Sequence, residues 1–131
     1  MNNIPSRNEL LEKYPPGTIV ELTAPLRDPY EKRLTTGSKA IITGADDYGN
    51  LLCRWDNGST LNIVPGDEFK IVGKFTNEMK AQLLELRASC VTNMFDINTV
   101  QRIALDKGWL ELTDFLETCR DIYAWWVLKG E

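Results

Sequence analysis

The chain has 131 residues, of which 43% are hydrophobic, so it is long enough to bury a core without disulfides or a structural metal. Fifteen Lys and Arg residues against nineteen Asp and Glu residues give a net charge of −4, the wrong sign for general attraction to nucleic acid or an anionic membrane. The sequence contains no histidine, which removes the usual general base of serine and cysteine nucleophiles. Most hydrolase mechanisms are therefore excluded.

The three cysteines, Cys53, Cys90 and Cys119, are far apart and form no Cys-x-x-Cys motif. Neither a disulfide framework nor a zinc site is indicated. No apolar stretch approaches the roughly 20 residues of a membrane span, and residues 1–6 lack a signal-peptide pattern. We therefore expect reduced thiols, a cytoplasmic location, and no metal, cofactor or membrane contact.

Residues 1–13 suffice for a turn or a short helix but offer little to bury, and we expect them to form a loosely held N-terminal arm. The Tyr14–Gly17 run is a rigid segment that leads into a strand, because each of its prolines fixes its own φ and favours extended geometry in the residue before it. Residues 18–23 then alternate as a strand does, with Ile19 on one face and Val20 on the other. Residues 24–38, with two prolines and a charged run, predict a long exposed loop.

Four more strands are expected, each a short apolar run bounded by turn-forming residues: 39–44, 51–55, 59–64 and 69–72. Asp56, Asn57 and Gly58 provide one of the intervening turns. A long loop after the first of five short strands, followed by tight hairpins, predicts a small SH3-like β-barrel over residues 14–73.

The hydrophobic period changes from two to about 3.6 after residues 73–75, which predicts a helical module over residues 74–131. One helical face of the first segment carries Met79, Leu83, Leu86 and Cys90. Asp96 is expected to cap a second helix that Gly108 ends, and a third helix is expected from about Leu110 to Leu128. The whole chain is thus predicted to be α+β, with a barrel followed by three helices.

Two stretches carry motifs that resemble known families. Tyr14-Pro15-Pro16-Gly17-Thr18, together with Trp55-Asp56-Asn57-Gly58 and Pro65-x-Asp67-x-Phe69, resembles an uncharacterised family of short β domains from bacterial and bacteriophage proteins. The stretch from Thr92-Asn93-Met94-Phe95-Asp96 to Gly130-Glu131 is similar to a second uncharacterised family, frequent in phage and mobile-element genomes. The resemblances cover residues 14–72 and about 76–131, and neither implies a catalytic residue, a cofactor or a substrate.

The resemblance implies a genomic setting. Small two-module phage accessory proteins often act on the host, and inhibitors of CRISPR or other bacterial defences are one such group. A phage-encoded chain would work in the host cytoplasm.

One candidate recognition surface is the loop of residues 25–39, in which basic side chains surround Tyr30: Arg27, Lys32, Arg33 and Lys39. An aromatic ring among cations can stack on a base while the cations pair with phosphates. The structural alternative is a solvated loop, because Asp28 and Glu31 neutralise about half of that charge.

The predicted third helix offers a second candidate surface, with four acidic side chains opposite its apolar stripe: Glu111, Asp114, Glu117 and Asp121. Such a face repels phosphates, which argues against a DNA-reading helix. It would suit a positively charged nucleic-acid channel in a host enzyme, because the acidic row mimics the charge of a nucleic acid.

The remaining candidate binding residues are tryptophans. Trp55 is either a core anchor or the floor of a ligand groove. Trp125 and Trp126 point about 100° apart on a helix, so Trp126 continues the buried stripe and Trp125 is partly exposed. With Trp109, Tyr123 and Val127, Trp125 would form an apolar patch for a partner or for a second copy of the chain.

No constellation of residues predicts catalysis. The acidic pairs Asp46-Asp47 and Asp67-Glu68 are assigned to turns, since adjacent residues of an extended chain point to opposite faces. We therefore predict a non-enzymatic protein that binds a host or phage protein. The alternatives are nucleic-acid binding through residues 25–39 and, more weakly, an enzyme whose site the sequence hides.

Overall fold

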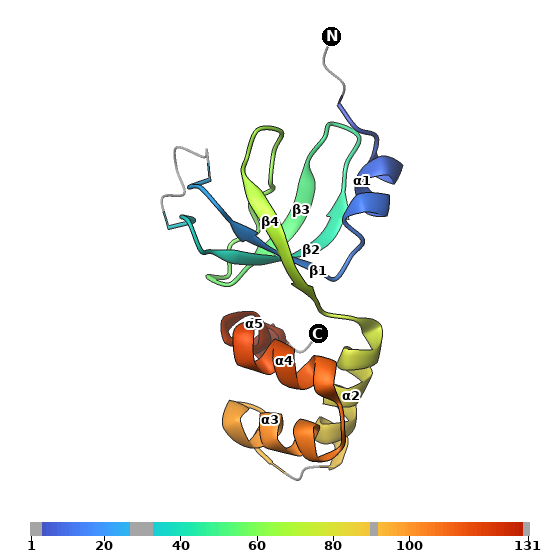
Figure 1. Ribbon diagram of the computed structural model, residues 1–131, viewed down its shortest axis with the longest axis vertical. Coiled ribbons are helices and arrows are strands. Elements are labelled where there is room, and N and C mark those ends of the chain that lie inside the picture. The colour runs from blue at the N-terminus through green and yellow to red at the C-terminus, as the bar shows by residue number, and fades with distance from the viewer. Residues whose placement is uncertain (1–3, 27–32, 90–91, 130–131) are drawn as a thin grey trace. The chain divides into compact units, whose positions relative to one another are not determined.

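The computed structural model describes residues 4–26, 33–89 and 92–129. The chain divides into two compact units, Met1–Lys74 and Phe75–Glu131, and each is described by itself. Cys90, which was predicted on the apolar face of the first helix, lies outside the described residues. Figure 1 shows a sheet in the N-terminal unit and helices in the C-terminal unit, so the coarse prediction of an α+β chain is confirmed.

The N-terminal unit contains one short helix and a four-stranded antiparallel sheet in the order β3-β2-β1-β4 (Figure 1). Its elements are α1 (Arg7–Lys13), β1 (Thr18–Leu22), β2 (Lys39–Ala45), β3 (Leu51–Trp55) and β4 (Phe69–Lys74). The central strand β1 pairs Val20 with Ala40 of β2 on one side and with Ile71 of β4 on the other. The strands predicted from alternation and turn chemistry therefore form, with one exception.

The exception is the strand predicted at residues 59–64. Within this described segment only Ile63 makes a bridge, exchanging backbone hydrogen bonds of 2.8 and 3.0 Å with Leu51. Side chains occupy other backbone groups: the Trp55 indole donates to the Leu61 carbonyl at 2.8 Å, and the Ser59 hydroxyl accepts from the Leu61 amide at 3.3 Å. The sheet of the described residues is open, and closure into an SH3-like barrel is not confirmed.

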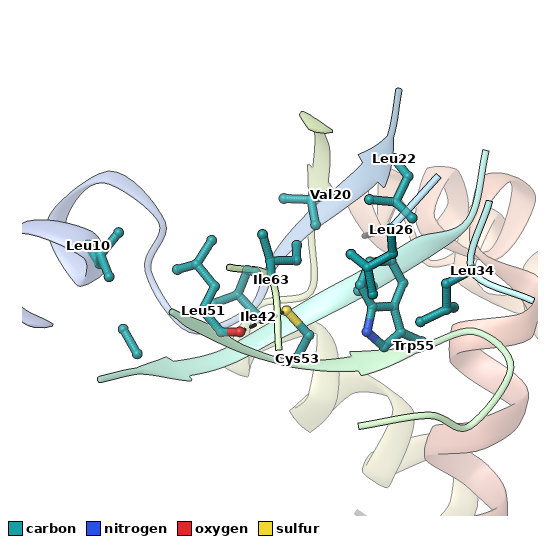
Figure 2. Close-up of a cluster of buried hydrophobic side chains, with 12 residues drawn as sticks. Leu10, Val20, Leu22, Leu26, Leu34, Ile42, Leu51, Cys53, Trp55 and Ile63 are labelled. Carbon is teal, nitrogen blue, oxygen red and sulfur yellow. Dashed lines mark hydrogen bonds between the residues drawn. The ribbon is translucent and has the colours of Figure 1, made fainter. Parts of the chain in front are cut away.

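The core of the N-terminal unit joins side chains from α1, the strands and the connecting loops, as Figure 2 shows. Its buried members are Leu10, Val20, Leu22, Leu26, Leu34, Ala40, Ile42, Ala45, Leu51, Cys53, Trp55 and Ile63. Trp55 is fully buried among them, which confirms that it is a core anchor. Val20 belongs to this cluster and Ile19 does not, as the alternation along β1 predicted.

The N-terminal segment is a capped helix rather than the loosely held arm that we expected. The Ser6 hydroxyl accepts from the Glu9 amide at 3.2 Å, and the Glu9 carboxylate accepts from the Ser6 amide at 3.5 Å, which completes a capping box. Leu10 is buried in the core, and the Arg7 amide donates to the Asp47 carboxylate at 3.0 Å. The Ser6-x-x-Glu9 spacing is a local signal for the helix, but the contacts of Leu10 and Arg7 that hold the helix in place involve residues distant in sequence and leave no local signal.

The edge strand β4 carries features that oppose pairing with another chain. The register with β1 shifts so that Val72 has no partner residue, which is the geometry of a β-bulge. Lys70 and Lys74 flank this bulge and are exposed. Bulges and lysines are common protections of sheet edges, so β4 is not a promising template for strand addition.

The described residues of the C-terminal unit form four helices: α2 (Asn77–Ser89), α3 (Ile97–Asp106), α4 (Leu110–Thr118) and α5 (Arg120–Lys129). The first two agree with the sequence prediction. Asp96 caps α3 by accepting from the Thr99 amide at 3.4 Å and from the Thr99 hydroxyl at 2.7 Å. Gly108 follows α3 with a φ of 77°, a value that favours glycine.

The predicted third helix is wrong as a single element, because it divides at Cys119 into α4 and α5. Cys119 has φ −127° and ψ 44°, outside the helical range. Immediately before it, the Thr118 hydroxyl donates to the Asp114 carbonyl at 3.0 Å. A hydroxyl that bonds the carbonyl four residues back competes with the helical hydrogen bond and bends or ends a helix. Within its described residues, the C-terminal unit therefore has four helices and not three.

The apolar stripe predicted across this region is nonetheless buried as expected: Leu112, Phe115, Leu116, Cys119, Ile122, Tyr123 and Trp126. The Phe75 ring stacks on Phe115 with centroids 4.5 Å apart and meets Trp126 edge-on at 5.9 Å. The Tyr123 hydroxyl donates to the buried Met94 carbonyl at 2.5 Å. This bond joins α5 to the turn that precedes α3.

Candidate partner-binding site

The four acidic side chains predicted for a binding surface are all exposed. Glu111, Asp114 and Glu117 follow one another at a spacing of three residues along α4, so they are neighbours on its surface. Asp121 lies in the first turn of α5, beyond the break at Cys119. The break means that Asp121 does not continue the row of α4 as it would on one unbroken helix.

Glu117 is engaged within the unit. Its carboxylate accepts from the Gln101 amide group at 2.8 Å and lies 3.8 Å from the Arg120 guanidinium. Arg120 also donates to Asn98 at 3.0 Å. Glu117 therefore helps to join α3 and α4.

A hollow of about 400 Å³ lies between α2 and the turn that joins α3 to α4; we name it the α2–α4 hollow. It is lined by Glu78, Met79, Gln82, Gly108, Trp109, Leu110 and Glu111. Met79 is buried, Trp109 is half-buried, and Leu110 is 62% exposed. Glu111 thus belongs both to the acidic row of α4 and to the hollow.

The turn at Gly108 places Trp109 and Leu110 in this hollow. With Gly108 in a left-handed conformation, the Trp109 amide reaches back to the Ala104 carbonyl at 2.9 Å, and α4 begins at the next residue. The ammonium of Lys107 lies 5.2 Å from the centre of the Trp109 ring, within the range of a cation–π contact.

Charges of both signs surround the hollow. Glu78 and Glu111 lie in the first turns of α2 and α4, where each helix N-terminus presents about half a positive charge. Each carboxylate carries a full negative charge, so it exceeds the helix dipole beside it. None of the described lining residues is basic, but the Lys107 ammonium lies beside Trp109, so positive and negative charges around the hollow are about equal.

The sequence predicted neither the hollow nor the contribution of α2 to it. Glu78 and Gln82 precede Trp109 by about 30 residues, and nothing in their local pattern connects them. In the sequence, the hollow is marked only by two large apolar residues, Trp109 and Leu110, directly after the helix-ending Gly108.

The predicted patch around Trp125 does not form as proposed. Trp126 is buried and Trp125 is half-buried, as predicted. Tyr123 and Val127, however, are buried, so they cannot join an exposed patch. Trp109 lies instead at the α2–α4 hollow. The patch was overestimated because the stripe on α5 is two residues wide, and it takes Tyr123 and Val127 inward with Ile122 and Trp126.

The predicted basic loop lies largely outside the described residues, since Arg27, Tyr30 and Lys32 belong to the segment 27–32. Arg33 is exposed. Lys39 begins β2 and lies 3.8 Å from the Glu21 carboxylate, which also lies 3.5 Å from Lys70. One carboxylate thus faces two ammonium groups on this side of the sheet.

The acidic pairs assigned to turns do serve as turn residues. Asp46 accepts from the Tyr48 amide at 2.8 Å and the Asn50 amide at 3.0 Å. Desolvation raises the pKa of the Asp46 carboxyl, but these hydrogen bonds outweigh it and hold the pKa below its usual value. Asp67 likewise accepts from the Val64 amide at 2.9 Å.

The described cysteines lack the features of a reactive thiol. Cys53 and Cys119 are both buried. Burial raises the pKa of the Cys53 thiol to about 12, although a hydrogen bond with the Ile63 backbone opposes the shift. Within the described ranges, no three His, Cys, Asp or Glu side chains are grouped as metal ligands would be. In the same residues no helix is long and apolar enough to cross a membrane.

Comparison with known families places a boundary where the structure has one. Residues 6–72 match the model of a family described as a domain of unknown function, DUF4314. Residues 75–131 match a second model with the same description, DUF5049. No curated protein and no solved structure matches the chain. The two uncharacterised families in series agree with the two resemblances found in the sequence.

Proposed function

We propose a binding function without catalysis for this chain, which belongs to the DUF4314 family through residues 6–72. Its target is a protein with a positively charged surface, and the C-terminal unit makes the contact. The observation that carries the proposal is the position of Glu111, which joins the exposed acidic row of α4 to the α2–α4 hollow, where Met79, Trp109 and Leu110 supply apolar surface. Protein interfaces commonly combine an apolar anchor with a charged rim.

The charge of the C-terminal unit supports this choice of partner. Residues 75–131 contain nine acidic and six basic side chains, so the unit is net negative. Complementary charge accelerates association and suppresses wrong partners, and it makes binding sensitive to salt. A natural target of this kind is the basic nucleic-acid channel of a host enzyme.

The biological setting follows from the resemblance rather than from geometry. We propose that the chain is a phage or mobile-element accessory protein that works in the host cytoplasm. Inhibition of a bacterial defence system, such as CRISPR, would fit a protein that occupies a nucleic-acid channel.

We also propose that the N-terminal unit is an incomplete relative of SH3-like barrels. The long connection between β1 and β2, followed by tight hairpins, supports this assignment. So does the Leu51–Ile63 bridge, which brings residues 59–64 against the free side of β3. Cross-strand nuclear Overhauser contacts between residues 59–64 and β4 would establish closure, and their absence would refute it.

The test uses the full chain, immobilised and exposed to a nuclease-treated host lysate. The variant Asp114→Lys with Asp121→Lys reverses two exposed carboxylates of the C-terminal unit. The control, Glu12→Lys with Glu85→Lys, makes the same change in net charge at exposed positions on α1 and α2. We expect one protein to be captured by the wild type and the control, to be lost with the variant, and to dissociate as salt increases. Equal capture by both variants would refute the acidic surface.

One observation favours nucleic-acid binding as the second candidate function. Lys39 and Lys70 share the single carboxylate of Glu21, and Arg54 lies opposite Ile41 on the same face of the sheet. This face therefore carries three basic side chains beside the loop of residues 25–39. If this face binds phosphates, Arg33→Ala with Lys70→Ala should weaken binding and reduce its salt slope by nearly one unit per lost contact. Salt-independent or absent binding would eliminate this candidate.

A further inference from the structure

The turn that follows β3 contains the sequence Asn57-Gly58, and we propose that Asn57 is a site of spontaneous deamidation in the folded protein. The nucleophile is the amide nitrogen of Gly58, and the group attacked is the side-chain amide of Asn57. Among the asparagines of the sequence, only Asn57 precedes a glycine. The proposal does not depend on the proposed function, because it concerns a reaction of the chain with water alone.

The reaction replaces one amide bond by another before water completes it. A bond forms between the Gly58 nitrogen and Cγ of Asn57, the Cγ–Nδ2 bond breaks, and Nδ2 leaves as ammonia with the proton of the Gly58 amide. The product is a five-membered succinimide. Water then opens the ring. Cleavage at Cγ gives aspartate, and cleavage at the main-chain carbonyl gives isoaspartate, in which the backbone runs through the former side chain.

The residue after Asn57 leaves the attacking nitrogen accessible. A Cβ on that residue would crowd the approach to Cγ, and glycine has none. Gly58 has a φ of 87°, a value that residues with a Cβ rarely adopt. Asn57 and Gly58 are both partly exposed, so water reaches the turn.

The side chain of Asn57 is oriented for the attack. The Ser59 amide donates to its Oδ1 at 2.9 Å. Negative charge develops on this oxygen as the Gly58 nitrogen adds to Cγ, and a donor already at that distance stabilises the charge. Nδ2 is buried and has no acceptor among the described residues, so the departure of ammonia breaks no hydrogen bond to the protein there.

One hydrogen bond opposes the reaction. The Gly58 amide donates to the Trp55 carbonyl at 2.9 Å, and this bond must open before the nitrogen can attack. Residues 56–59 are all partly exposed, so water can replace the lost partner while the turn opens. The bond therefore slows the reaction without preventing it.

Two other asparagines are controls within the same chain. Oδ1 of Asn93 accepts from the Phe95 amide at 2.9 Å, the same arrangement as in the Asn57 turn, but Met94 follows instead of a glycine. Asn50 donates its side-chain amide to the Asp46 carboxylate at 2.9 Å, so its leaving group is engaged. Asn93 thus isolates the effect of the glycine, and Asn50 is the asparagine expected to react least.

The experiment incubates the full chain at mildly alkaline pH, in buffer and in urea, and follows each asparagine by peptide mass mapping. Chromatography of the peptides separates aspartate from isoaspartate. We expect both products at Asn57 in buffer, at a rate at least about tenfold above that at Asn93, which corresponds to a barrier lower by about 1.4 kcal/mol. The variant Asn57→Gln keeps a side-chain amide but would have to close a six-membered ring, so the release of ammonia should fall.

Two results would overturn the proposal. One is conversion at Asn57 that is no faster than at Asn93, which would show that Gly58 gives no advantage in this turn. The other is conversion in urea without conversion in buffer, which would show that the hydrogen bond to the Trp55 carbonyl protects the folded chain.

Discussion

The Tyr123 hydroxyl makes a buried bond whose removal has a calculable cost. Tyr123 is fully buried, and its hydroxyl donates to the carbonyl of Met94, a residue that is itself only 8% exposed. The change Tyr123→Phe removes the hydroxyl and keeps the ring. The Met94 carbonyl then loses its donor in a place that water does not readily reach, and an unsatisfied buried group costs about 1–3 kcal/mol.

This loss corresponds to a large change in thermal midpoint. For a unit of fewer than 100 residues, 1 kcal/mol shifts the midpoint by about 4–8 °C, so a loss of about 2 kcal/mol lowers it by about 8–16 °C. Urea unfolding, followed by circular dichroism and tryptophan fluorescence, gives the free energy directly. The matched control is Tyr48→Phe, because Tyr48 is 76% exposed and its change should cost less than about 0.5 kcal/mol.

The pH dependence provides a second measurement of the same bond. Burial raises the pKa of Tyr123 to about 12, although the nearby Arg87 charge opposes the shift. Between the ordinary tyrosine pKa of about 10 and this value, the unfolded phenol ionises while the folded one keeps its proton. The unfolded state then binds fewer protons, so the free energy of unfolding falls as pH rises.

Phenylalanine cannot ionise, so the gap in stability between the wild type and Tyr123→Phe should narrow above about pH 10. The reasoning fails if the variant loses less than about 0.5 kcal/mol at neutral pH, or if the two pH profiles are parallel.

Three further predictions concern the cores and the thiols. Trp126→Ala should cost about 3–5 kcal/mol and Trp125→Ala about 1 kcal/mol or less in urea unfolding, and equal losses would place both rings in the core. Cys53 should resist iodoacetamide at pH 8 until urea unfolds the chain, as read by peptide mass mapping; alkylation of the folded protein would contradict its burial. Its raised pKa also predicts that stability declines above about pH 9. A fragment of residues 4–74 should unfold cooperatively, and one of residues 14–74 should melt at a lower temperature because Leu10 is missing; equal midpoints would show that α1 contributes nothing.

Most helices and strands could be predicted because their own residues carry the pattern that specifies them. Alternation specified β1 to β3, and the capping side chain of Asp96 and the positive φ of Gly108 specified the ends of α3. The break at Cys119 escaped prediction because the apolar period continues through it, and only the hydrogen bond of Thr118 marks it. The missing strand at residues 59–64 depends on the Trp55 indole, whose donor occupies a backbone carbonyl there.

The candidate site was predicted only where neighbouring residues of one helix form it. The row from Glu111 to Glu117 is a helical spacing and can be read from the sequence. The engagement of Glu117 with Gln101 depends on how α3 packs on α4. The hollow at Trp109 needs Glu78 from another helix, and no single-sequence pattern brings those residues together.

The order of strands also bears on when the N-terminal unit can be completed during synthesis. β1 lies between β2, which is the next strand in the chain, and β4, which ends at Lys74 (Figure 1). The β1–β2 pair can form once residue 45 has emerged from the ribosome, but the other side of β1 has no native partner until β4 is made. Pairing between segments so distant in sequence closes a long loop and is slow relative to local pairing. The nascent sheet thus presents the open side of β1, rather than the bulged and lysine-flanked edge of β4, to other chains throughout that interval.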